Sequence, residues 1–151
     1  MHYTQALSTP IGFLNITADR EHLLGIEPEE TPIASRPNRH SEAAHERLKA
    51  YFEGANPDFS DLPFLWPTAP FYAQVLQTLL KSRYGTRLSY QALAQLAGHP
   101  KAHRAAAAAV ARNRFAVAIA CHRVVHASGG VGAYRWGPAK KAWLLHHEAL
   151  G

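Results

Sequence analysis

Cysteine is almost absent from this chain of 151 residues, in which Cys121 is the single example. One cysteine cannot form an intramolecular disulfide, and it cannot supply a cysteine-rich zinc site. Long apolar runs are missing too, since no stretch is long enough to cross a bilayer. The first residues lack the charged leader and apolar segment of a secretory signal. We therefore expect a cytoplasmic protein with no membrane association.

Acidic residues are scarce in the second half of the chain. Residues 62–151 contain eleven lysines and arginines but a single acid, Glu148, whereas residues 1–61 contain ten acids and five bases. This asymmetry favours a polyanion as the partner of the second half, although a basic surface that serves only solubility explains the charge equally well. The lone Glu148 suits pairing with a histidine, and the simpler interpretation is a weak surface pair with Lys141.

The sequence pattern of the N-terminal part predicts a small sheet, followed by one helix. Turn signals separate three stretches with strand character, at Tyr3–Ser8, Phe13–Ala18 and Leu23–Ile26.

Apolar residues at helical spacing predict a helix over residues 42–53, which Gly54 ends. A connector punctuated by prolines follows, and we place the boundary between two lobes there. Residues 1–66 then form an N-terminal α/β lobe, and residues 67–151 form a second domain.

The sequence pattern of the second domain predicts mostly helices. Phe71 begins an apolar helical face that ends near Ser82, and Ser89 can cap a short helix that stops at Gly98. Pro100 suits the first turn of another helix over Lys101–Arg112. The two short helices read as a helix-turn-helix, a motif that many helical pairs resemble.

The second of these helices presents Arg104 beside an unbroken run of alanines. Alanines cannot read base edges, but they allow a helix to approach sugars and phosphates closely, and an arginine there could enter a duplex from which a base has left. The alternative is that the alanines pack against a neighbouring helix, as some of them must.

Phe115–Ala120 is an apolar run that predicts a short buried strand ending at Cys121, and a final helix is expected over Pro138–Ala149. The fold class is therefore α/β. An α+β N-terminal lobe with a small antiparallel sheet precedes a mostly helical lobe with a helix-turn-helix and a short active-site strand.

Cys121 precedes a histidine, and this pair suggests nucleophilic chemistry. A free thiol is mostly protonated at neutral pH, and an imidazole steadied by a carboxylate raises its useful thiolate fraction. His122 and Glu148 provide that set. Because consecutive strand residues point to opposite faces, His122 can serve Cys121 only through a bridging water or a local turn. Taken alone, the pair fits a core cysteine beside a satisfied histidine better.

At this point the chain resembles the O6-alkylguanine-DNA alkyltransferases. The resemblance runs without an evident gap from about Pro70 to Glu148, slightly over half of the chain. It is carried by Tyr84-Gly85, Ser89-Tyr90, Pro100-Lys101, Arg104-Ala105, Asn113, Cys121-His122-Arg123-Val124-Val125, Gly129, Gly132, Tyr134-Arg135-Trp136-Gly137 and the segment Lys141 to Glu148.

The resemblance implies roles for several positions. Cys121 would accept the alkyl group, activated through water by His122 and Glu148, while Asn113 would tie the helix-turn-helix to the active-site turn. Arg104 would fill the vacated base stack. DNA contacts would come from Arg104, Tyr90, Ala105 and Ala106, and the substrate pocket from Tyr90, Val110, Val124, Tyr134 and Arg135.

The implied activity is that of a methylated-DNA–protein-cysteine methyltransferase acting in DNA repair. An alkyl group would move irreversibly from O6 of guanine, with O4-alkylthymine as a further substrate, to Cys121. Each molecule would act once, after minor-groove binding and base flipping. The partner would be double-stranded DNA carrying O6-alkylguanine, and no cofactor or metal would be needed. We expect a monomer, with cooperative binding to DNA as an alternative.

Three departures and three rival functions stand beside this prediction. The family's proline before the cysteine is Ala120, an expected threonine is Arg87, and alanine replaces a small glycine within Ala106–Ala108. Ala120 alone favours a non-catalytic alkyltransferase-like lesion-binding protein. A plain helix-turn-helix DNA binder is disfavoured because the alanine run lacks side chains that read bases. A Cys-His hydrolase is disfavoured because the sequence offers no candidate oxyanion motif.

Overall fold

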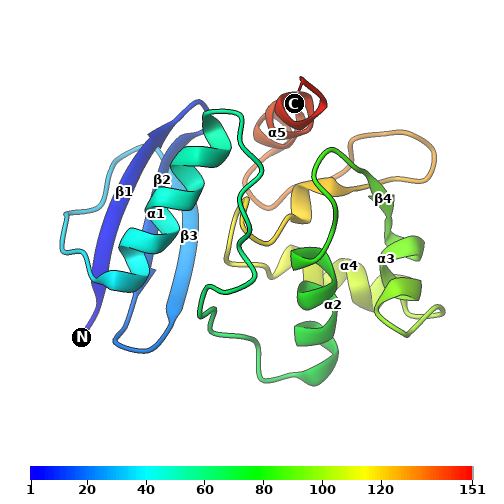
Figure 1. The fold of residues 1–151 in the computed structure, drawn as a ribbon. Coiled ribbons are helices and arrows are strands. Elements are labelled where there is room, and N and C mark those ends of the chain that lie inside the picture. Colours follow the sequence, from blue (N-terminus) through cyan, green and yellow to red (C-terminus); the bar gives the residue numbers. More distant parts are fainter. Residues whose placement is uncertain (151) are drawn as a thin grey trace. The chain divides into compact units, whose positions relative to one another are not determined.

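The computed structural model describes residues 1–150, which fall into two compact units (Figure 1). The first unit contains residues 1–65 and the segment 114–118, and the second contains residues 66–113 and 119–150. The expected domains, residues 1–66 and 67–151, stay a prediction, and their boundary lies one residue after the first of these divisions. The segment 114–118 also belongs to the first unit, although it lies far along the chain. A single boundary between two domains cannot describe this arrangement.

The first unit is built on a three-stranded antiparallel sheet in the order β1-β2-β3. The strands are β1 (Tyr3–Thr9), β2 (Gly12–Ala18) and β3 (Leu23–Glu29), so the third extends three residues beyond its predicted end. In the turn between β1 and β2, Gly12 has φ +102°, and a Cβ there would lie 3.1 Å from the Glu29 carbonyl oxygen. Glycine is required there for both reasons.

One helix, α1 (Arg39–Phe52), covers this sheet and contacts β1 and β2. It begins three residues before its predicted start because Asn38 and Ser41 form a reciprocal capping box. Ala44, Leu48 and Tyr51 are buried on one face, at the spacing of an amphipathic helix.

The predicted strand Phe115–Ala120 is wrong. The run is buried, but it forms a turn, in which Val117 has φ +70°. Its first residues bond to one residue of β3: the Ile26 N–H donates to the Arg114 carbonyl, and the Ala116 N–H donates to the Ile26 carbonyl. A run of apolar residues indicates burial, but it does not specify the backbone conformation.

The second unit contains α2 (Pro70–Leu80), α3 (Tyr90–Leu96), α4 (His103–Ala111) and α5 (Pro138–Leu150). Ser89 caps α3 as predicted, with its Oγ accepting from the Ala92 N–H at 3.1 Å. Helices α3 and α4 pack together as the expected helix-turn-helix pair. The second helix starts later than predicted, since the Ala102 N–H bonds to the His99 carbonyl and Pro100 lies in the connecting turn.

A two-stranded parallel ladder completes this unit. Strand β4 (Leu88–Ser89) pairs with β5 (Val124–Val125), and the 3-10 helix η1 (Cys121–Arg123) leads directly into β5. Among residues 1–150, no helix is long and apolar enough to span a membrane.

Candidate active site

Cys121 occupies the first position of η1, and a tight turn holds it there. The Cys121 N–H donates to the Ile119 carbonyl at 2.7 Å, and the Arg123 N–H donates to the Ala120 carbonyl at 3.1 Å. The sequence required either a water or a local turn for the cysteine and its neighbouring histidine to cooperate. The turn is present.

A cavity of about 190 Å³ opens beside the Cys121 thiol. The parallel pairing of Ser89 with Val125 places the next residue, Tyr90, beside the cysteine segment. The cavity is lined by Tyr90, Ala107, Val110, Ala111, Cys121, Ala133, Tyr134 and Arg135. Tyrosine rings, alanine and valine give it a largely apolar wall, which suits a flat aromatic ring.

Val124 is the exception among the residues predicted to line this pocket. Its side chain is fully buried, and the residue pairs with Leu88 in the β4–β5 ladder. Its carbonyl accepts a hydrogen bond from Nζ of Lys141 at 2.5 Å. Its predicted contact with the substrate base stays a prediction.

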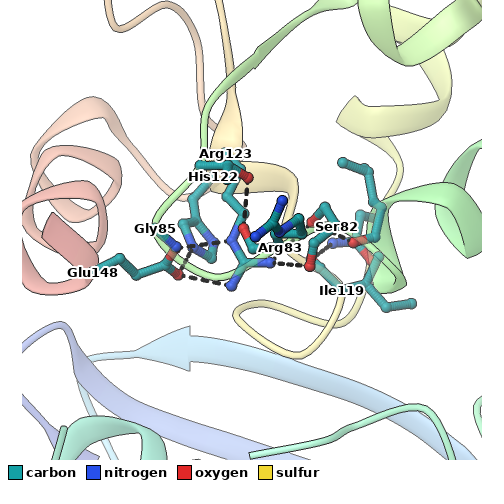
Figure 2. A network of polar contacts seen from close by, with 10 residues as sticks. Ser82, Arg83, Gly85, Ile119, His122, Arg123 and Glu148 are labelled. Carbon is teal, nitrogen blue, oxygen red and sulfur yellow. Dashed lines mark hydrogen bonds and ion pairs between the residues drawn. The ribbon is translucent and has the colours of Figure 1, made fainter. Parts of the chain in front are cut away.

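His122 and Glu148 form a buried pair (Figure 2). Nε2 of His122 lies 2.6 Å from Oε2 of Glu148, and the two side chains are 0% and 2% exposed. Burial lowers the pKa of His122 below its usual range against the opposing pull of Glu148, so the imidazole is neutral. Its Nε2–H donates to the carboxylate, which leaves Nδ1 as a base. Within residues 1–150, buried Nδ1 accepts no hydrogen bond.

Two further groups hold the Glu148 carboxylate. Arg123 donates from Nε to Oε1 at 2.9 Å and from Nη2 to Oε2 at 3.2 Å, and the Gly85 N–H donates to Oε1 at 3.0 Å. Burial alone would raise the pKa of Glu148, but the hydrogen bonds from His122 and Arg123 hold it well below its usual range. The carboxylate therefore stays ionised inside the protein.

The thiol itself rests in its protonated form. Burial raises the pKa of Cys121 to about 11, although a hydrogen bond from Asn113 and the positive charge of Lys141 act in the opposite direction. Burial therefore opposes the increased thiolate fraction that we expected from the sequence. A base must remove the proton when the sulfur reacts.

Asn113 and Lys141 brace the segments around the thiol. The fully buried Asn113 donates from Nδ2 to the Ile119 carbonyl at 2.9 Å, while its own carbonyl accepts from Nη1 of Arg135 at 3.0 Å. Nζ of Lys141 donates to the carbonyls of Val124 and, at 3.0 Å, of Ala133, so this buried cation joins the exit of η1 to the pocket wall. Sequence reasoning assigned Arg123 no role, and it suggested for Lys141 only a weak surface pair with Glu148. The signal available was that both belong to the matched motif segments.

The exposed surface of α4 carries Arg104 and Ala105, as a contact with DNA requires. Ala106 is 0% exposed and faces the core, so its predicted contact with DNA is wrong. Glu148, the one acid after residue 65, is itself buried. Every exposed charged side chain among residues 66–113 and 119–150 is therefore cationic, which favours a polyanion as partner.

No group of three or more histidine, cysteine or acidic side chains that could hold a metal ion occurs within residues 1–150. A buried cysteine beside a His–Glu pair, joined to a helix-turn-helix, defines the class as a DNA-binding protein with a potential acceptor thiol.

Comparison with known proteins agrees with this class. Residues 70–150 match the family described as 6-O-methylguanine DNA methyltransferase, DNA binding domain. The bifunctional transcriptional activator/DNA repair enzyme Ada of Escherichia coli is 49% identical over 79 residues, which cover 52% of this chain and 22% of that protein. The methylated-DNA–protein-cysteine methyltransferase of Mus musculus is 36% identical over 168 residues, covering 95% of this chain and 80% of the mouse protein.

The solved structure of Mycobacterium tuberculosis OGT in complex with DNA superposes with a TM-score of 0.84 at 30% identity, covering 97% of this chain and 92% of that one. This similarity confirms the predicted α/β fold. The chain belongs to the O6-methylguanine-DNA methyltransferase family, because the family match covers more than half of it and the mouse relative aligns along nearly all of it.

Proposed function

We propose that the protein repairs DNA by transferring an alkyl group from O6 of guanine to Cys121, irreversibly and once per molecule. The observation that carries this proposal is the position of Cys121 in the pocket wall, next to a buried neutral histidine whose Nδ1 can accept a proton. The relatives named as methylated-DNA–protein-cysteine methyltransferases support the same reaction.

The reaction is a displacement at the alkyl carbon. His122 takes the thiol proton on Nδ1, through a bridging water, while Glu148 stabilises the imidazolium that forms. A sulfur lone pair forms the S–C bond, and the electron pair of the broken C–O6 bond stays with the guanine, which takes up one proton. The product on Cys121 is a thioether, which water does not hydrolyse, and the chemistry requires no metal or organic cofactor.

The target base must leave the duplex to reach this sulfur. Exposed Arg104 on α4 fills the gap in the stack, and the cationic surface of the second unit binds the flanking phosphates. Extrusion costs a few kcal/mol, which these contacts offset. Tyr90 and Tyr134 then stack on the everted base, and Val110 and Arg135 close the pocket. Repair of O4-alkylthymine, monomeric binding and a cytoplasmic location remain predictions.

A titration of repair against protein tests the proposal. A duplex with one O6-methylguanine is incubated with increasing amounts of protein, and the remaining lesion is quantified after digestion to nucleosides. One guanine should be restored for each protein molecule, with no further repair on longer incubation and none with Cys121→Ser. Binding of the lesion without loss of the methyl group would instead favour the non-catalytic lesion-binding function. Repair beyond one lesion per molecule would exclude the suicide reaction.

A further inference from the structure

We propose that Arg123 is a positioning residue, which fixes and neutralises the Glu148 carboxylate so that His122 remains uncharged and able to accept the thiol proton. This inference rests on the proposed function, because it concerns the base of that reaction.

The contacts of Arg123 divide its guanidinium between two partners. Nε and Nη2 face the two oxygens of Glu148, while Nη1 donates to both the carbonyl and Oγ of Ser82 at 2.9 Å (Figure 2). The guanidinium carbon lies 5.9 Å from the centre of the Tyr84 ring. Arg123 is buried, with 7% of its surface exposed, so these contacts surround its guanidinium. A bidentate arginine fixes both the position and the plane of a carboxylate.

The charge of the arginine matters as much as its geometry. A carboxylate bonded to an imidazole favours the charged form of that imidazole, and a cation close to the same carboxylate opposes this effect. A histidine that is already charged cannot serve as a base. Arg123 supplies a positive charge close to the Glu148 carboxylate, which reduces the pull of that carboxylate on a proton at His122. The imidazole then stays neutral while it keeps its hydrogen bond to Glu148.

The groups that act on His122 are few. Glu148 and Lys141 face it from α5, and Arg123 and Cys121 belong to its own turn, with Tyr84 lying behind Arg123. Glu148 favours the charged imidazole, whereas burial, Arg123 and Lys141 disfavour it. Removal of Arg123 deletes one of the two opposing cations and leaves only burial and Lys141 to oppose the attraction of Glu148.

The test uses two substitutions of Arg123 and a free-base substrate. Arg123→Gln removes the positive charge, whereas Arg123→Lys keeps the charge but cannot form the bidentate contact with Glu148. Arg87→Gln is the control, because Arg87 is an exposed arginine. The rate of alkylation of the intact protein by O6-benzylguanine is measured from pH 5 to 8, which removes DNA binding from the comparison. Thermal unfolding and binding to undamaged duplex report whether each variant is folded.

The two substitutions should have different effects. In Arg123→Gln, the fall in rate on acidification should move upward by about one pH unit, because His122 becomes easier to protonate. In Arg123→Lys, that fall should stay within a few tenths of a unit of the wild type while the plateau rate drops about tenfold through lost orientation. Arg87→Gln should match the wild type.

A wild-type profile in Arg123→Gln, or equal profiles in the two variants, would overturn the proposal. If Arg123→Gln does not fold, Arg123→Lys decides: a reduced plateau with the same acid dependence supports the proposal, and a wild-type plateau overturns it.

Nitrogen-15 NMR of the His122 ring separates this inference from the proposed function. Neutral His122 protonated on Nε2 in the wild type, and charged His122 at mildly acidic pH in Arg123→Gln, would support the role of Arg123 even if no alkyl transfer occurred. Alkyl transfer with an unchanged His122 signal in Arg123→Gln would leave the function standing and refute the role.

Discussion

Nδ2 of Asn113 donates a hydrogen bond to the carbonyl oxygen of Ile119 at 2.9 Å, and the same oxygen accepts the N–H of Cys121 at 2.7 Å. The five residues between Asn113 and Ile119 belong to the first unit, where they bond to β3. The Asn113–Ile119 bond therefore closes the chain into a loop immediately before the acceptor cysteine. One carbonyl oxygen links the end of α4 to the backbone of Cys121.

Asn113→Ala should weaken both the fold and the reaction. The substitution leaves the buried Ile119 carbonyl with one donor fewer, so the free energy of unfolding should fall by about 1–3 kcal/mol. Because the bond acts on the turn and not on DNA, alkylation by duplex DNA and by O6-benzylguanine should slow by the same factor. Urea unfolding and the two rates check this. A loss confined to the duplex substrate would contradict the role in the turn.

Arg104→Ala should act on the duplex alone. The side chain is exposed on α4, outside the residues that line the pocket, so the reaction with free O6-benzylguanine should change by less than about twofold. Repair of duplex DNA should fall by about tenfold or more, because extrusion of the base then proceeds without a side chain to fill the stack. Lys101→Ala serves as the control for a lost phosphate contact, which lowers affinity and the salt dependence of binding. Equal losses on both substrates would remove the intercalating role.

The raised pKa of Cys121 predicts a loss of stability in alkaline solution. The unfolded thiol ionises near pH 9, whereas the native thiol keeps its proton until about pH 11. Between these values the native state binds more protons, so the free energy of unfolding decreases as the pH rises through that window. The decrease should be on the order of 2 kcal/mol. Denaturant unfolding at pH 8 and pH 10.5 should show it as a steeper loss in the wild type than in Cys121→Ser, and parallel losses would contradict the protonated resting thiol.

Ala120→Pro should be tolerated and mildly stabilising. Ala120 has φ −77°, within the range that proline adopts, and its N–H makes no backbone hydrogen bond among residues 1–150. Its carbonyl, which accepts from Arg123, is unaffected by the change. Restriction of the unfolded chain should add about 0.4–1 kcal/mol to the free energy of unfolding. The melting temperature and the rate with O6-benzylguanine measure the effect, and a destabilised or slow variant would show that the turn needs the alanine.

The sequence carried enough information to place most helices, the sheet and the reactive pair, since these depend on local periodicity and on matched motif residues. Ser89 indicates the start of α3, whereas the Cys121-His122 pair and the lone Glu148 indicate the site only together with the matched motif residues around them. The errors have a common cause. An apolar pattern indicates burial, so it could not distinguish a strand from the turn that contains Val117 at φ +70°. In the alanine run of α4 every residue has the same side chain, so the pattern could not show that Ala106 faces the core. Arg123 was matched in the motif but given no role, because a basic residue in a basic segment resembles surface charge.

The account depends most on one event at one atom, the formation of a thioether on the sulfur of Cys121. After incubation with excess duplex carrying O6-methylguanine, the protein is digested and the peptide that contains Cys121 is analysed by tandem mass spectrometry. We predict complete conversion to a peptide heavier by a single methyl group, with the modification on the cysteine and no change on prolonged incubation. An unmodified Cys121 peptide, in protein that has removed the methyl group from DNA, would contradict the mechanism.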